Sequence, residues 1–215
     1  MIAFATLYKA VMKNEAGFNP NDQGARAYNG INERYHPQWS GWKEIDRVAA
    51  TRTIRRGEVL PQLDQATQDF YKAYWKGAGL DTSKVENLKL AILLVDMCTQ
   101  HGQWARVVNA GLQRRSPFVT GIINKIGETE YRKMNTAPAQ SYKDIATARV
   151  EYVKGIPLQN EADRRGIINR AQSYLNDALK YLKENPGTSS AVGLLAIGAL
   201  TALFFLKPSR KKRKA

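Results

Sequence analysis

The chain contains very little cysteine and histidine, and this scarcity excludes several classes of function. Cys98 is its only cysteine, so a small secreted module stapled by disulfides within the chain is excluded. His36 and His101 are the only histidines, and without a histidine pair at ligand spacing a zinc site is not expected. A Gly-rich phosphate loop and a dinucleotide-binding fingerprint are also missing. We therefore expect no metal and no cofactor. We expect Cys98, which lies in an apolar run, to be a small core residue.

Acidic residues are also scarce, at 19 against 33 basic ones, which gives a formal net charge of +14. Six of the basic residues fall within 207–215, and the remaining 27 leave a net charge of +8 on the rest of the chain. A basic surface attracts anionic partners over a long range. The bacterial cell wall and nucleic acid fit this charge equally well, so charge alone does not choose between them.

The pattern of apolar residues predicts a mainly α-helical fold. A stripe formed by Phe4, Leu7, Tyr8, Val11 and Met12 has helical spacing and predicts a first helix over 2–14. Residues 17–57 are rich in Gly, Asn, Pro and Trp and predict a small irregular or β lobe, in which Asn29-Gly30 is a hairpin turn signal. Further helices are predicted over 62–75, 85–101, 104–113, 117–133, 141–153 and 160–183.

Glu15 continues the apolar stripe of the first helix, and Gly17 follows as a helix-ending residue. A carboxylate at the end of a buried stripe loses solvation, which raises its pKa and favours the protonated form. A protonated carboxyl at neutral pH is what a general acid requires. The alternative is a surface glutamate at a frayed helix end.

A series of short motifs runs along the chain at 14–18, 21–25, 29–31, 36–42, 45–46, 70–75, the helix around Asp96, and 165–170. In order and spacing they resemble glycoside hydrolase family 108, a family of phage and bacterial lysozyme-like muramidases. The resemblance extends over 1–184 and is strongest in the first 75 residues. It implies a lysozyme-like α+β fold and cleavage of the β-1,4 bond between N-acetylmuramic acid and N-acetylglucosamine in peptidoglycan, by hydrolysis or by lytic transglycosylation.

The resemblance also implies roles for particular residues. Glu15 would be the general acid, and Asp22 would position water or stabilise positive charge on the sugar, unless it is only an Asx-turn residue. Four further residues are expected to bind substrate, although each tryptophan is alternatively a core residue. These four are Tyr28, Asn29, Trp39 and Trp42.

Three alanines depart from the family pattern. Ala16 and Ala25 stand where the family usually has glycine, and Ala27 stands where threonine is common. Part of the support around the acid is therefore altered. The alternative function is accordingly a non-catalytic protein that binds the cell wall or forms part of a virion membrane.

The end of the chain predicts a membrane anchor. After the domain over 1–184, a linker over 185–190 leads to an uncharged apolar run over 191–206, and a basic tail occupies 207–215. Sixteen helical residues span about 24 Å, slightly less than a hydrocarbon core of roughly 30 Å, and flanking residues can extend this span. We expect a single-pass transmembrane helix at 191–206; the alternative is a buried core helix.

The basic tail also bears on location. Its charge places it on the cytoplasmic side of a host inner membrane, or facing packaged DNA inside a lipid-containing phage virion. The first 30 residues show no signal-peptide pattern. Anionic lipid or nucleic acid is therefore an expected partner of the tail, and a nucleic-acid-binding membrane protein is a third interpretation. The sequence does not indicate an oligomeric state.

Overall fold

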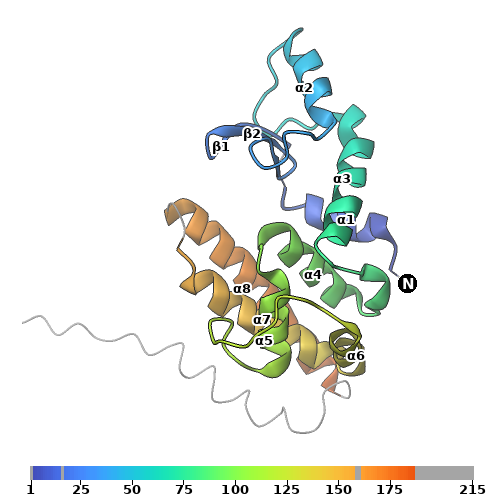
Figure 1. Ribbon diagram of the computed structural model, residues 1–215, viewed down its shortest axis with the longest axis vertical. Helices are drawn as coiled ribbons and strands as arrows, with labels where there is room; N and C mark the ends of the chain where they lie inside the picture. The colour runs from blue at the N-terminus through green and yellow to red at the C-terminus, as the bar shows by residue number, and fades with distance from the viewer. Residues whose placement is uncertain (1, 16, 158–160, 187–215) are drawn as a thin grey trace, which may run out of the picture.

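The computed structural model describes residues 2–15, 17–157 and 161–186, which form two lobes joined by α1 and α3 (Figure 1). The small lobe holds a three-stranded sheet and α2, and the larger lobe is built from the later helices. In chain order the helices are α1 (Phe4–Met12), α2 (Gly41–Ala49), α3 (Asp64–Gly77), α4 (Leu88–Gln100), α5 (Trp104–Gln113), α6 (Glu128–Thr136), α7 (Pro138–Gly155) and α8 (Glu161–Glu184). Short 3-10 turns lie at Pro61–Leu63 and Thr82–Lys84.

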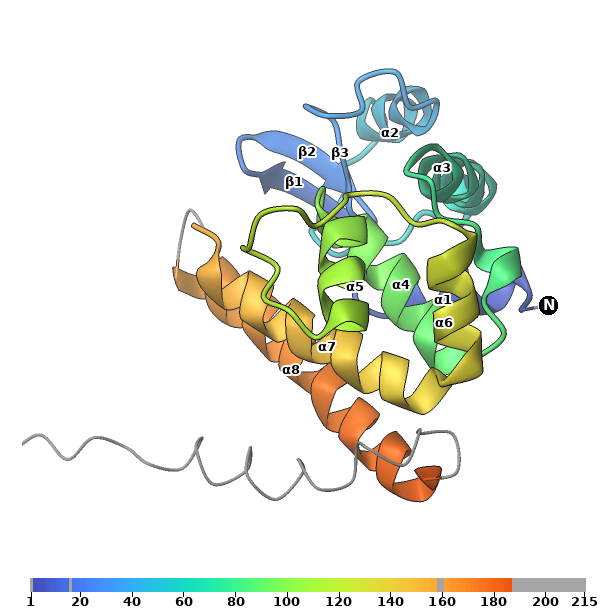
Figure 2. The ribbon, with the colours of Figure 1, turned by 60° about the horizontal axis from the view of Figure 1, so that its bottom comes forward.

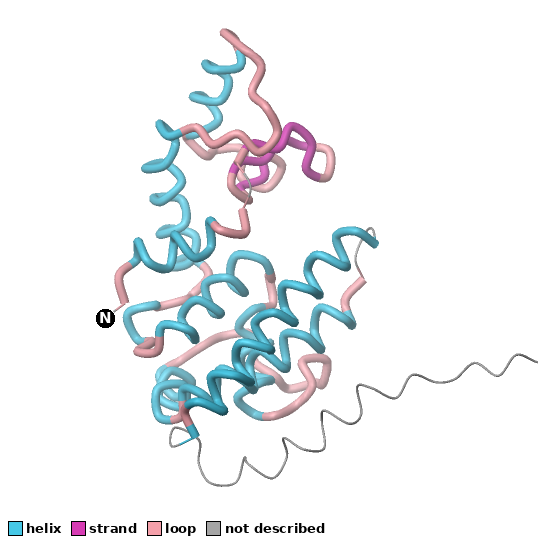
Figure 3. The backbone as a smooth tube through the Cα atoms, turned by 180° about the vertical axis from the view of Figure 1, so that it is seen from behind, coloured by secondary structure: helices cyan, strands magenta, loops and turns pink. Residues whose placement is uncertain are grey.

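The sheet consists of β1 (Phe18–Asp22), β2 (Ala25–Tyr28) and β3 (Ile31–Asn32), paired antiparallel in chain order. Tyr28 pairs with Ile31 across Asn29-Gly30, which confirms the hairpin turn predicted there. The strands and the loops around them occupy one end of the molecule in Figure 3. Tyr28 ties this lobe together, because its hydroxyl donates to the Leu60 carbonyl and accepts from the Leu60 amide while its ring stacks on Trp39.

The helical lobe is organised around α4, whose residues from Leu90 to Cys98 are almost all buried. This helix contacts α1, α3, α5 and α7. The two longest helices, α7 and α8, lie side by side across the lobe (Figure 2). Cys98 is buried in the core, as predicted. The apolar run that predicted a central helix is therefore explained by burial on every side of α4.

Two predictions about elements were wrong. The segment 17–57, predicted to be irregular or β, contains α2, whose Trp42, Ile45 and Val48 face the core at helical spacing. The helix predicted over 117–133 is a loop up to Gly127, and only α6 follows. Side chains of α5 bind the backbone carbonyls of this loop. The Arg106 guanidinium donates to the carbonyls of residues 117 and 119, and the Asn109 amide donates to those of residues 123 and 125.

The mainly helical chain with a small sheet near its start agrees with the expected lysozyme-like α+β class. Among the described residues, no helix combines the length and the apolar character needed to cross a bilayer. The predicted span 191–206, the basic tail 207–215 and most of the linker lie outside the described residues.

Gly111 gives a test of the packing between α5 and α7. A Cβ at this position would lie 2.6 Å from Ile145 Cα and 2.9 Å from the Asp144 carbonyl oxygen, both backbone atoms that cannot rotate away. We expect Gly111→Ala to lower the free energy of unfolding by about 1–3 kcal/mol, as overpacked core substitutions do. Chemical denaturation measures this change.

Gly77→Ala is the matched control, because no atom lies within 4 Å of a Cβ at that position in the last turn of α3. There the better helix propensity of alanine should leave stability unchanged or raise it by up to about 1 kcal/mol. Equal effects of the two substitutions would contradict the close approach of α5 to α7.

Candidate functional site

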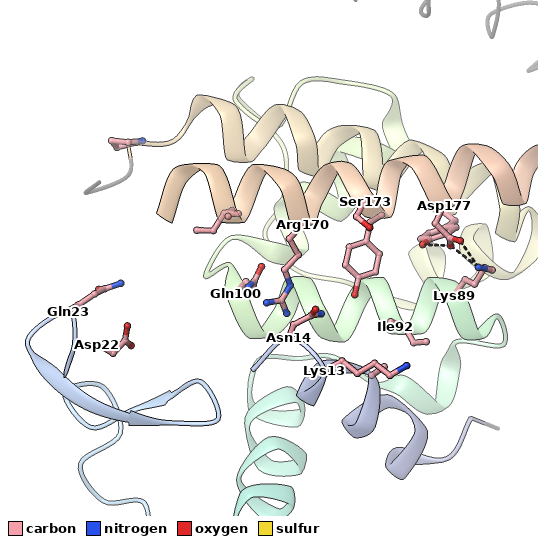
Figure 4. Close-up of a pocket in the computed structure, with 16 residues that line it drawn as sticks. Lys13, Asn14, Asp22, Gln23, Lys89, Ile92, Gln100, Arg170, Ser173 and Asp177 are labelled. Atoms are coloured by element: carbon pink, nitrogen blue, oxygen red, sulfur yellow. Dashed lines mark hydrogen bonds and ion pairs between the residues drawn. The ribbon is translucent and has the colours of Figure 1, made fainter. Parts of the chain in front are cut away.

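A groove of about 1110 Å³ lies where the β1–β2 hairpin, the end of α1 and the side of α8 approach one another (Figure 4). Asp22 and Gln23 line it from the hairpin, and Arg170 reaches from α8 toward Asn14 at the end of α1. The groove continues between α1 and α8 over α4. Its lining on this side includes Lys13, Lys89, Ile92, Ser173, Tyr174 and Asp177.

Glu15 lies three residues after the end of α1, next to Asn14 of this lining, and 15% of its side chain is exposed. Its Oε1 accepts from both terminal nitrogens of Arg170, at 3.2 and 3.3 Å. On the other side, Oε2 faces Gly30: a Cβ there would lie only 2.6 Å from it and 3.0 Å from the Tyr71 hydroxyl. The Tyr71 hydroxyl donates to the Asn29 carbonyl at 2.6 Å, which holds the turn against α3. The left-handed backbone of Gly30, at φ +78°, and its missing side chain therefore leave room for the carboxyl.

Arg170 is shared between two carboxylates. Besides Glu15, it binds Asp96 Oδ1 through Nε at 3.0 Å and through one terminal nitrogen at 2.5 Å. The other oxygen of Asp96 lies 2.5 Å from Nη2 of Arg149 on α7. Both Asp96 and Arg149 have fully buried side chains, whereas 16% of the Arg170 side chain is exposed. The four residues form a chain of alternating charges that begins in the core and ends at the groove.

This arrangement gives the two carboxyls opposite pKa shifts. Burial raises the pKa of Glu15 above its ordinary value, Arg170 opposes this rise, and the negative charges of Asp96 and Asp22 reinforce it. Burial would also raise the pKa of Asp96, but Arg149 and Arg170 together bring that pKa below its ordinary value. Asp96 is therefore held ionised, and Glu15 is the carboxyl on which a proton is retained at higher pH.

Asp22 ends β1 on the other side of the groove from Arg170 (Figure 4). The Asn32 amide donates to its carboxylate at 2.9 Å and to its backbone carbonyl at 2.8 Å. The Asx-type contacts of this hairpin come instead from Asn19 and Asn21, which accept from backbone amides of residues 21 and 24. The turn thus does not use the Asp22 carboxylate, which Asn32 orients at the edge of the groove.

The four residues predicted to bind substrate lie inside the small lobe. Tyr28, Asn29, Trp39 and Trp42 are each less than 9% exposed. Trp39 and Trp42 pack edge to face, and their indole nitrogens donate to the carbonyls of Ala66 and His36. Their packing matches the core alternative for the tryptophans, and their contact with a sugar stays a prediction.

Two of the three alanines that depart from the family pattern lie among the described residues. Ala27 is buried in β2, opposite Asn19 and Asn32, and Ala25 pairs with Asp22. Ala16 lies outside the described residues.

The sequence pointed to Glu15 and Asp22 but assigned no role to Asp96, Arg149 or Arg170. One signal was present, because Asp96 interrupts the apolar run of α4 and a lone charge in a buried helix requires a partner. The partners come from α7 and α8, 53 and 74 residues later in the chain, and no local pattern identifies them. Within the described residues, no group of three or more His, Cys, Asp or Glu side chains is placed to hold a metal ion.

The raised pKa of Glu15 leads to a stability prediction. Because its folded-state pKa lies above the unfolded value, the ionised carboxylate destabilises the fold once the pH exceeds the ordinary glutamate pKa of about 4.3. We expect Glu15→Gln to raise the melting temperature at neutral pH. The gain should shrink as the pH falls toward this value, where both folded and unfolded chains carry the proton.

Glu33→Gln is the matched control of opposite sign, since hydrogen bonds from Arg26 lower the pKa of Glu33. That variant should lose stability at neutral pH, and its deficit should also vanish in acid. A Glu15→Gln variant that is less stable than the parent at neutral pH would contradict the pKa direction given for Glu15.

The family described as Glycosyl hydrolase 108 matches residues 8–102, which cover the small lobe, the second half of α1, α3 and α4 and amount to less than half of the chain. The fold is similar to the structure of Brucella abortus SagA, with a TM-score of 0.55 and 18% identity over 83% of this chain and 94% of that one. At this identity the likeness concerns the fold alone. No curated protein matches the chain. The family match, which includes Glu15, Asp22 and Asp96, supports a relationship to glycosyl hydrolase family 108 and a glycoside hydrolase activity.

Proposed function

We propose that this chain is a muramidase that cleaves the β-1,4 bond between N-acetylmuramic acid and N-acetylglucosamine in peptidoglycan. The observation that carries the proposal is Glu15, a nearly buried carboxyl with a raised pKa that is hydrogen-bonded to Arg170, a residue lining a groove between the two lobes. The match to glycosyl hydrolase family 108 over residues 8–102 supports the same reaction class.

In this mechanism Glu15 is the general acid. Its protonated carboxyl donates to the glycosidic oxygen as positive charge develops on the sugar ring. Burial and the nearby negative charges of Asp96 and Asp22 raise the pKa of Glu15, which favours its protonated form before the transfer. Arg170 then compensates the negative charge that remains on Glu15 after the transfer, because both of its terminal nitrogens already contact Oε1.

Asp22 is the second carboxylate of the proposal. It lies at the edge of the groove opposite Arg170, held by Asn32, and its negative charge stabilises the developing positive charge on the sugar or orients the attacking water. Tyr28, Asn29, Trp39 and Trp42 enter the proposal as the packed interior that fixes the hairpin and the Gly30 turn beside Glu15.

The experiment compares the full chain with Glu15→Gln on purified peptidoglycan and detects released fragments by mass spectrometry. We expect the parent to release muropeptides and Glu15→Gln to lose at least about 100-fold in rate, the usual contribution of a general acid. Glu86→Gln removes an exposed carboxylate at the start of the helical lobe and should keep the parental rate. Reducing or anhydro ends on the fragments distinguish hydrolysis from transglycosylation.

The competing function is a protein that grips the cell wall or builds a virion membrane without cleaving glycan. The absence of a threonine hydroxyl at Ala27, which is buried beside Asn32, favours it. Binding of peptidoglycan by both the parent and Glu15→Gln, without fragments from either, would replace the muramidase proposal with this one.

We further propose that residues 191–206 anchor the enzyme in a host inner membrane or in the membrane of a lipid-containing phage virion. The support is the sequence alone: an uncharged apolar run followed by the basic tail 207–215, which favours contact with anionic lipid headgroups or packaged DNA.

The proposed anchor predicts that the chain binds to lipid vesicles. With lipid vesicles, the full chain should sediment and resist extraction by high salt, because the apolar run is buried in hydrocarbon. A chain ending at residue 186 should stay in the supernatant. Release of the full chain by salt would instead indicate that only the charged tail holds it at the surface.

A further inference from the structure

The ion pair between Asp96 and Arg149 lies behind the proposed acid and is not explained by the reaction itself. Arg149 has no exposed side-chain surface, and its Nε and Nη1 have no hydrogen-bond partner among the described residues. Its other contacts are a hydrogen bond to the Gln100 side chain at 2.9 Å and the face of the Tyr174 ring at 5.0 Å. A buried, incompletely bonded guanidinium is a poor way to stabilise a core, because apolar residues of similar size often serve as well or better.

The geometry gives this pair a different use. Asp96 contacts Arg149 through Oδ2 and Arg170 through Oδ1, so Arg149 holds one oxygen while the other faces Arg170. The Nε and Nη2 of Arg170 bind Asp96 at 3.0 and 2.5 Å. Nη1 and the same Nη2 contact Glu15 over the longer distances of 3.2 and 3.3 Å. The guanidinium is thus bound more closely to Asp96 than to Glu15.

We propose that Asp96 and Arg149 are positioning residues for Glu15: Arg149 fixes Asp96, and Asp96 takes the larger share of Arg170 so that Glu15 is contacted but not neutralised by it. This inference rests on the proposed function, in which Glu15 must carry a proton. An arginine paired with Glu15 alone would favour the carboxylate and disable a general acid. Asp96 prevents this by dividing the positive charge, and Arg149 supplies the counter-charge that allows an ionised Asp96 to exist in the core.

Among the described residues, the charged and titratable groups that act on Glu15 are consistent with this division. Asp22 on β1 and Asp96 on α4 add negative charge, and Arg170 on α8 adds positive charge. Burial keeps the Tyr71 hydroxyl on α3 protonated, because it raises the pKa of that tyrosine well above its ordinary value. Behind Asp96, burial and Arg149 lower the pKa of His101 to about 3, so this imidazole is neutral and does not compete for Asp96.

The test measures the titration of Glu15 itself. Carbon-13 NMR of labelled carboxyls in the full chain monitors this titration. Its resonance is identified by its loss in Glu15→Gln. In Asp96→Asn, Arg170 turns wholly to Glu15, and we expect the titration midpoint to fall by about one pH unit. The high-pH limb of peptidoglycan cleavage should fall with it. A purely structural role for Asp96 would lower the melting temperature without moving either midpoint.

Asp96→Asn leaves Arg149 buried without its partner, and the fold can fail for that reason. The double variant Asp96→Asn with Arg149→Met removes both charges and avoids this problem. We expect the same downward shift, because Asp96 acts on Glu15 directly whereas Arg149 lies beyond it. Asp144→Asn is the control, since Asp144 is another largely buried, ion-paired aspartate, which binds Arg114 and Lys143 instead.

The outcomes separate the two proposals. A Glu15 midpoint that stays at the parental value in the double variant, or that moves as far in Asp144→Asn, overturns the positioning role even if the chain cleaves peptidoglycan. A midpoint that falls in the Asp96 variants alone supports the positioning role even if no fragments are released, and in that case only the muramidase proposal fails.

Discussion

The rest of the site depends on one guanidinium at the groove, that of Arg170, which joins Glu15 to Asp96 in the core. Arg170 reaches from α8 across the end of α1 to α4, so a single side chain ties together three elements that are far apart in the chain. In a nearly buried ion pair, the attraction between the charges offsets the cost of their desolvation only if the geometry is fixed. The packing of α7 against α8 and of α7 against α5 provides that fixity, because the helix backbones approach closely at Gly111.

The small lobe also fixes the position of Glu15, from the side opposite Arg170. The Glu15 carboxyl fits against the Gly30 turn because that turn has no side chain and because Tyr71 holds the preceding carbonyl. The turn in turn depends on Tyr28, whose hydroxyl both donates to and accepts from the backbone of Leu60. The buried aromatic residues thus control the position of the acid indirectly, by fixing the hairpin from inside.

The sequence predicted the parts of this site that depend on local order. The stripe of α1 placed Glu15 at a helix end, and Asn29-Gly30 was confirmed as a turn, because both features are set by neighbours in the chain. The same pattern could not distinguish tryptophans that line a groove from tryptophans that fill a lobe, since Trp39 and Trp42 have the apolar surface required for either. Nor could it find the partners of Asp96, because those contacts arise only when α7 and α8 fold back across α4.

The two aspartates near Glu15 differ in burial and in the groups that bind them. Asp22 lies at the groove and is held by an amide, which orients its carboxylate without cancelling its charge. Asp96 lies in the core and is held by two guanidinium groups, which keep it ionised despite its burial. If Asp96 were uncompensated, its burial would drive it to take up a proton, and it would then no longer hold Arg170 away from Glu15. In the positioning role proposed above, Arg149 keeps Asp96 ionised, and Asp96 in turn limits how far Arg170 can lower the pKa of Glu15.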